Sequence, residues 1–62
     1  MLFQFRDDYG FDRGIDPNMV KKIERLMPRE GSTVFVYLKD GSRIAVGEPE
    51  AQLIRRCNKA LS

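Results

Sequence analysis

Residues 33–46, TVFVYLKDGSRIAV, decide the fold of this 62-residue chain. The run from Val34 to Leu38 consists of β-branched, aromatic and aliphatic side chains, which are typical of a β-strand. Asp40-Gly41 then marks a tight turn, and Arg43 to Val46 return as the partner strand. The segment therefore predicts a β-hairpin with strands over Thr33 to Lys39 and Arg43 to Val46.

Two registers of this hairpin give opposite cores. A three-residue loop, Asp40-Gly41-Ser42, would pair Leu38 with Ile44 and Val36 with Val46. The face that meets a helix would then hold the aliphatic side chains of both strands, namely Val34, Val36, Leu38, Ile44 and Val46. Phe35 and Tyr37 would stand on the other face, where an exposed aromatic pair indicates a partner-binding or dimer contact. A two-residue loop would instead build the core from Phe35, Tyr37, Ile44 and Val46, and the sequence leaves both registers open.

The C-terminal residues predict an amphipathic helix. Glu48-Pro49-Glu50 suits a helix start, because proline is tolerated early in a helix and acidic groups favour the positive end of its dipole. Leu53, Ile54, Cys57 and Leu61 follow on one face, which we expect to pack on the sheet. The basic side chains near the helix end point mostly away from this stripe, namely Arg55, Arg56 and Lys59.

The N-terminal residues predict a second hairpin. Phe3 and Phe5 alternate with polar residues before a turn over 7–10, DDYG, and Phe11, Arg13 and Ile15 continue in extended form. We expect the aspartates of this region to occupy solvated turn positions and, at Asp16, a helix cap. They are Asp7, Asp8, Asp12 and Asp16.

Residues 16–27 fit either a helix or a strand. Asp16 is a good N-cap, Pro17 suits a first helical position, and Val20, Ile23 and Met27 recur at helical spacing. A helix of this length would leave too few strands for a stable sheet, since three or more are needed. We therefore expect a single helical turn over Pro17 to Met19, a strand over Lys21 to Met27, and a turn over Pro28 to Ser32.

These elements predict an α+β fold with about four or five short antiparallel strands and one C-terminal amphipathic helix packed on one face. The length favours a single domain over residues 1–62. The composition, 42% hydrophobic and 32% charged, is typical of a folded globule, and no apolar run is long enough to span a bilayer. One cysteine and a start without the features of a secretory signal favour a cytoplasmic protein.

The order of these elements over residues 15–61 resembles the small flagellar-associated proteins of the FlbD type and their bacterial relatives. The likeness rests on IDPNMV at 15–20, Ile23-Glu24, a hairpin with Asp40-Gly41, and the final amphipathic helix. In that family the equivalent of Asp16-Pro17-Asn18 precedes a strand, which favours the strand over Lys21 to Met27. The resemblance implies a small regulatory or adaptor protein without catalysis.

The residue types exclude the common catalytic and metal-binding motifs. The chain has no histidine and one cysteine, Cys57, so an intrachain disulfide and the usual zinc ligand sets are absent. An EF-hand loop begun at Asp8 would place Arg13 at its sixth position and Met19 at its twelfth, where ligands or glycine are required. We therefore expect no enzyme, no metal, no cofactor, and a buried packing role for Cys57.

Two kinds of binding stay open. The first is protein–protein interaction through Phe35 and Tyr37, either by a regulator or adaptor that binds another protein or a second copy of itself, or by a small phage-encoded inhibitor of a host protein. The second is nucleic-acid binding through basic clusters in the middle of the chain and on the last helix. Its candidate residues are Lys21, Lys22, Arg25, Arg55, Arg56 and Lys59.

Overall fold

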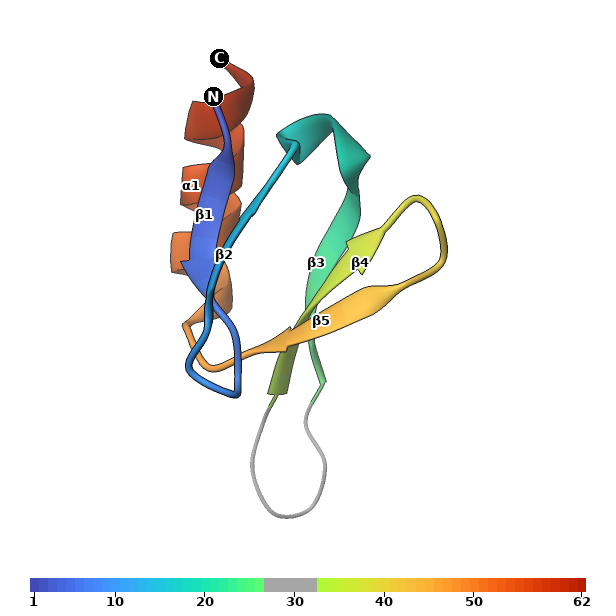
Figure 1. The fold of residues 1–62 in the computed structure, drawn as a ribbon, viewed down its shortest axis with the longest axis vertical. Coiled ribbons are helices and arrows are strands. Elements are labelled where there is room, and N and C mark those ends of the chain that lie inside the picture. The colour runs from blue at the N-terminus through green and yellow to red at the C-terminus, as the bar shows by residue number, and fades with distance from the viewer. Residues whose placement is uncertain (27–32) are drawn as a thin grey trace.

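A computed structural model describes residues 1–26 and 33–62 of the chain, and it confirms the α+β class. The elements in chain order are β1 (Phe3–Arg6), β2 (Asp12–Ile15), the 3-10 turn η1 (Pro17–Met19), β3 (Val20–Leu26), β4 (Thr33–Leu38), β5 (Arg43–Val46) and α1 (Glu50–Leu61). Figure 1 shows α1 running alongside β1, with the described chain ends at the same end of the molecule.

The strands form two antiparallel sheets that are joined at one point. β1 pairs with β2, which confirms the N-terminal hairpin, and β4 lies between β3 and β5 in the second sheet. An antiparallel bridge between Asp7 and Val46 connects the end of β1 to the end of β5. The Asp8 amide donates to the Ala45 carbonyl at 2.9 Å beside this bridge. The first hairpin therefore continues the edge of the three-stranded sheet.

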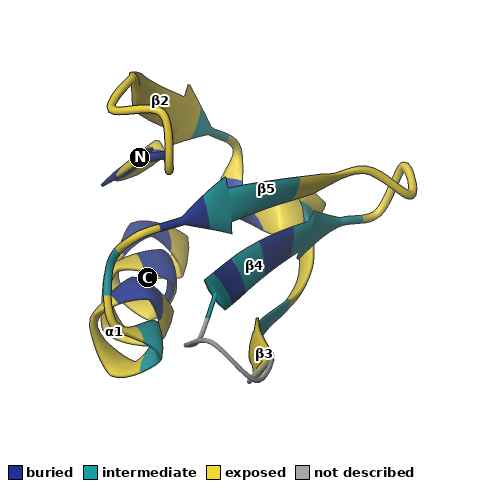
Figure 2. Ribbon diagram, turned by 90° about the horizontal axis from the view of Figure 1, so that it is seen from below, coloured by how far each residue is buried: buried dark blue, intermediate teal, exposed yellow. Residues whose placement is uncertain are grey.

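The core lies between these sheets and α1. Figure 2 shows buried segments on β4, β5 and α1. The phenyl groups of Phe3 and Phe5 enter from β1 with ring centroids 5.0 Å apart. The buried apolar residues are Phe3, Phe5, Val34, Val36, Val46, Leu53, Cys57 and Ala60.

The buried stripe of α1 is narrower than the sequence predicted. Leu53 and Cys57 are buried as expected, and Ala60 joins them. Ile54 and Leu61 were predicted on the same face but are exposed. Successive helical residues turn by about 100°, so a stripe through positions 53, 57 and 60 leaves these two side chains at its margin.

The β4–β5 hairpin has the predicted faces but a different register. Val36 pairs with Ile44 and Val34 with Val46, so the predicted pairing of Leu38 with Ile44 is wrong. The two-residue loop with an aromatic core is also wrong, because Val34, Val36 and Val46 are buried. Loop geometry gives the reason: Gly41 has φ +94°, and the Leu38 amide donates to Ser42 O at 2.9 Å. The loop therefore spans 39–41, one residue earlier than predicted.

β3 confirms the strand interpretation through Leu26, and η1 confirms the helical turn before it. The Asp16 carboxylate accepts from the Asn18 amide at 2.9 Å, which is the predicted cap. The expected end of the strand at Met27 and the turn over Pro28 to Ser32 lie outside the described residues.

A β-bulge explains why this strand has helical spacing. Val20 pairs with Leu38, whereas Lys22 pairs with Tyr37, so the register shifts at Lys21. The extra residue puts Val20 and Ile23 on the same face, where both pack against the core. Without a bulge, residues three apart in a strand would point to opposite faces.

Within residues 1–26 and 33–62, no helix is both long and apolar enough to cross a membrane.

Candidate interaction surfaces

The outer face of the three-stranded sheet carries the aromatic pair that the sequence singled out. Val34 and Val36 of β4 point into the core, so Phe35 and Tyr37 point away from α1. Their ring centroids lie 6.0 Å apart, with the rings tilted by 50°. Both residues are half-buried, and no sheet or helix among the described residues covers this face.

A basic side chain lies over each of these rings. Lys22 Nζ on β3 is 4.9 Å from the centroid of Tyr37, and the Arg43 guanidinium on β5 is 4.6 Å from the centroid of Phe35. Such cation–π contacts contribute about 0.5–1 kcal/mol each at exposed sites. Lys22 also contacts Glu24 at 3.4 Å. The tertiary structure thus joins one of the predicted basic residues to the predicted aromatic pair, and it adds Arg43.

The other predicted basic residues do not gather on this face. Lys21 occupies the exposed bulge, and Arg25 lines a hollow that also contains Asp8, Glu48 and Glu50. On α1, Arg56 Nη1 is 2.7 Å from Glu48 Oε2. Lys59 and Arg56 line a shallow surface beside β1, and Arg55 is exposed. The six candidates for nucleic-acid binding are therefore distributed over several surfaces.

A buried carboxylate organises the loop between β1 and β2. The Asp7 side chain accepts hydrogen bonds from the Tyr9 amide at 3.0 Å, the Phe11 amide at 2.9 Å and Arg13 Nε at 2.8 Å. The hydrogen bond from Arg13 lowers the pKa of the Asp7 carboxyl below its ordinary value of 3.8, and this effect outweighs the raising effect of burial. The prediction that the aspartates occupy solvated turn positions is therefore wrong for Asp7.

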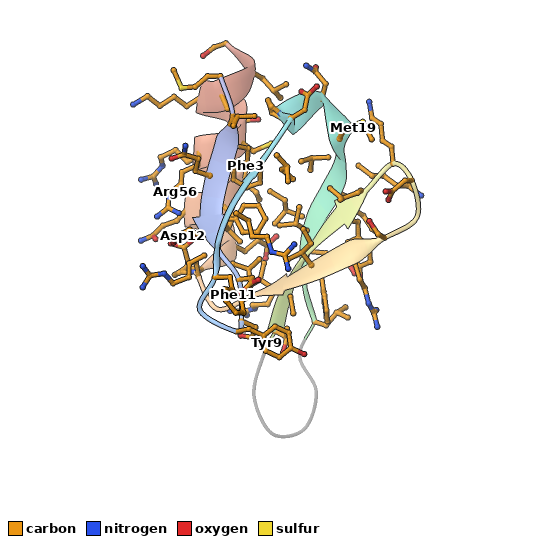
Figure 3. The ribbon with its side chains drawn as sticks, viewed as in Figure 1. Phe3, Tyr9, Phe11, Asp12, Met19 and Arg56 are labelled. Atoms are coloured by element: carbon orange, nitrogen blue, oxygen red, sulfur yellow. The ribbon has the colours of Figure 1, made fainter. Side chains whose placement is uncertain are left out.

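The same loop exposes two aromatic side chains. The Asp7 amide donates to Phe11 O at 2.9 Å, and the Gly10 amide donates to Asp7 O at 3.0 Å, with Gly10 at φ +86°. The loop is closed by these bonds, while Tyr9 is 86% exposed and Phe11 67% exposed. Figure 3 shows both residues toward one end of the long axis, opposite Met19.

The sequence analysis did not identify this loop as a candidate surface, because it interpreted 7–10 as an ordinary turn. One signal was present: Tyr9 and Phe11 occupy positions in and beside a turn, where polar residues and glycine are usual. Aromatic groups in such a turn have little chance to reach the core.

The described residues also bear on metal and thiol chemistry. Across residues 1–26 and 33–62, no three potential metal-ligating side chains lie close enough together to hold an ion. Cys57 is buried as predicted, and burial raises the pKa of its thiol. Its environment therefore disfavours the reactive thiolate.

No protein-family model, curated protein or solved structure matches this chain. The FlbD-type resemblance stays an expectation from the order of elements, and the function has to be argued from the side chains themselves.

Proposed function

We propose that this protein acts without catalysis, as a small regulator or adaptor that binds another protein through the loop over 7–11. The observation that supports this is the exposure of Tyr9 and Phe11 on a loop held by the buried Asp7 carboxylate. Aromatic side chains are enriched at protein interfaces, where they dominate the binding energy.

The hydrogen bonds around Asp7 favour binding for a second reason. A loop that is ordered before binding loses less conformational entropy when it meets a partner. Tyr9 and Phe11 are presented by a backbone that three hydrogen bonds to one carboxylate hold in place, two from amides and one from Arg13. The loop is therefore better suited to a specific contact than an unbraced turn with the same residues.

Phe35 and Tyr37, the predicted partner-binding residues, offer less apolar surface than this loop. Both are half-buried, and Lys22 and Arg43 lie over their rings. The loop over 7–11 thus replaces them as the proposed protein-binding surface. A second copy of the chain and, for a phage-encoded inhibitor, a host protein are partners that this surface suits.

Site-specific photo-cross-linking in cells tests the proposal. The photo-reactive p-benzoylphenylalanine is introduced at Phe11 in one variant and at Met19, which is also exposed, in the matched control. We expect a covalent adduct with one protein from position 11 and none from position 19. Equal adducts from both positions, or none from position 11, would contradict the proposal.

Light scattering after gel filtration identifies the homodimer case. A dimer that becomes monomeric on Tyr9→Ser/Phe11→Ser, with an unchanged circular dichroism spectrum, would make the partner a second copy. A monomeric wild-type protein assigns the adduct to a different protein.

A further inference from the structure

Four side chains cluster on the outer face of the three-stranded sheet. Lys22 on β3 lies over Tyr37, Phe35 follows on the same strand as Tyr37, and Arg43 on β5 lies over Phe35. Arg43 is the register partner of Tyr37, so it reaches diagonally to the neighbouring ring. We call Lys22, Phe35, Tyr37 and Arg43 the aromatic platform.

We propose that the aromatic platform binds single-stranded nucleic acid, with bases stacked on Phe35 and Tyr37 and phosphates paired with Lys22 and Arg43. Aromatic side chains on the open face of a sheet are a common means of holding unpaired bases, and nearby cations follow the phosphate backbone. This inference is independent of the loop over 7–11, because it uses other residues and another partner.

The spacing of the two rings fits this ligand. Phe35 and Tyr37 are two residues apart on one strand and therefore share a face, with centroids at 6.0 Å. Two separate rings along an extended strand suit two successive bases that have been unstacked from each other. A duplex would not present its bases to such a surface.

The positions of Lys22 and Arg43 over the two rings do not prevent base stacking, because these side chains can move away from the rings. Lys22 and Arg43 are long surface side chains, and an exposed cation–π contact is weaker than the stacking of a base on an aromatic ring. When a base takes the place of the cation over a ring, the released charge lies close to the phosphate of that nucleotide. The exchange therefore replaces each cation–π contact with a stacking contact and an ion pair.

Charge complementarity favours nucleic acid over a neutral partner. Two of the four platform residues are cations, and Glu24, the carboxylate beside Phe35 in the β3–β4 register, is already in contact with Lys22. An acidic peptide would satisfy Lys22 and Arg43 but would leave the ring faces without a planar partner. The rings thus distinguish the two anionic ligands.

The intrinsic fluorescence of Tyr37 gives a direct measurement. The chain has two tyrosines and no tryptophan, so Tyr9→Phe makes Tyr37 the sole strong fluorophore. The probe is an oligothymidylate of about twelve nucleotides, which spans a site of the size that a small single-strand-binding surface covers. We expect quenching on titration at low salt, with log K falling against log salt by a slope of about −1.4 for two phosphate contacts.

Matched variants separate stacking from charge. Phe35→Leu/Tyr37→Leu keeps apolar side chains on the sheet but removes the rings, and its affinity, measured with a fluorescein-labelled probe, should fall about tenfold or more. Lys22→Gln should reduce the salt slope by about 0.7. Arg55→Gln removes an exposed charge from α1 and should leave both quantities unchanged. Circular dichroism verifies that each variant is folded.

Three results would overturn the proposal. The first is the absence of quenching and of probe binding at low salt by folded protein. The second is equal weakening by Lys22→Gln and Arg55→Gln, which would show that any positive charge suffices. The third is equal affinity for polyglutamate of similar length, because this would make the platform a site for acidic peptides.

Discussion

Arg13 Nε donates a 2.8 Å hydrogen bond to the Asp7 carboxylate, whose side chain is 1% exposed. Asp7 directly follows β1 and Arg13 lies in β2, so this bond spans the loop between the two strands, and Asp7 also bridges to Val46 of β5. One buried acidic side chain thus holds the loop closed beside the junction of the two sheets. The exposed positions of Tyr9 and Phe11 depend on it.

Replacement of Asp7 by alanine should destabilise the protein and release the loop. The amides of Tyr9 and Phe11 would lose their acceptor, and Arg13 would lose its partner. We expect the Tm to fall by more than about 5 °C in thermal unfolding followed by circular dichroism. Asp12→Ala is the control, since the ion pair between Asp12 and Arg6 is exposed and should contribute little. Equal losses in the two variants would contradict the role given to Asp7.

Acid should destabilise the folded protein partly through Asp7. Its pKa is lower in the folded state than the ordinary value of 3.8, so its contribution is complete above about pH 3.8 and is lost as the pH falls through the lowered pKa. The Ser42 hydroxyl lowers the pKa of Asp40 as well, so this residue adds to the effect. The free energy of unfolding, measured between about pH 5 and pH 2, should therefore depend less steeply on pH in Asp7→Asn than in the wild-type protein. An unchanged slope in Asp7→Asn would refute the assignment.

Leu53 and Ile54 are neighbours on α1 with different surroundings, and they provide a direct test of the core. Leu53 is fully buried, so Leu53→Ala should cost about 2–5 kcal/mol, which is comparable with the whole stability of a domain of this size. Ile54→Ala should cost less than about 1 kcal/mol, because its side chain is already exposed. Urea unfolding measures both, and the reverse order would mean that the helix packs on its other side.

Gly41 should be more sensitive to substitution than Gly14. A Cβ at Gly41 would meet no atom within 4 Å, but φ is +94°, where an alanine costs about 1–2 kcal/mol. A Cβ at Gly14 would meet the end of the exposed Leu2 side chain at 3.3 Å, which can move aside. Gly41→Ala should therefore lower the free energy of unfolding by about 1–2 kcal/mol and Gly14→Ala by less than about 0.5 kcal/mol. Similar effects of the two substitutions would argue against a turn over 39–41.

Cys57 should be inert to thiol reagents in the folded protein. Burial raises the pKa of its thiol above the ordinary value of 9.0, which lowers the thiolate fraction, and the side chain faces the core. Reaction with Ellman's reagent at about pH 8 should be slow in native buffer and fast in concentrated urea. Rapid reaction of the native protein would place Cys57 at the surface.

The element order was predictable because local signals were strong. The apolar run from Val34 to Leu38, the turn at Asp40-Gly41 and the proline before Glu50 each act over a few residues. The structure confirms the two strands and the helix that they predict, β4, β5 and α1. The segment over 20–26 was the difficult case. Its bulge places Val20 and Ile23 on one face of a strand, so a helical spacing arose without a helix.

The candidate surfaces were less predictable, since they combine residues that are distant in sequence. The sequence named Phe35, Tyr37 and Lys22 as binding candidates in separate groups. Strand pairing brings Lys22 and Arg43 over the two rings, and no spacing along the chain indicates that. Arg56 and Lys59 of α1 do not reach this face, because they lie beside β1.

The sequence by itself determined the hairpin strands over 33–38 and 43–46, the C-terminal helix, and that alternate residues of Thr33 to Leu38 face opposite ways, because these features follow from propensity and periodicity. The tertiary structure decided the hairpin register, the burial of Asp7 and the exposure of Tyr9 and Phe11. Each of these depends on contacts between different segments of the fold. The Asp7–Val46 bridge, for example, joins the end of the first strand of the chain to the last. The Asp7 carboxylate accepts its three hydrogen bonds from residues nearby in sequence, but β5, which bridges to Asp7 through Val46, is distant in sequence. The local sequence therefore does not predict that this carboxylate is buried.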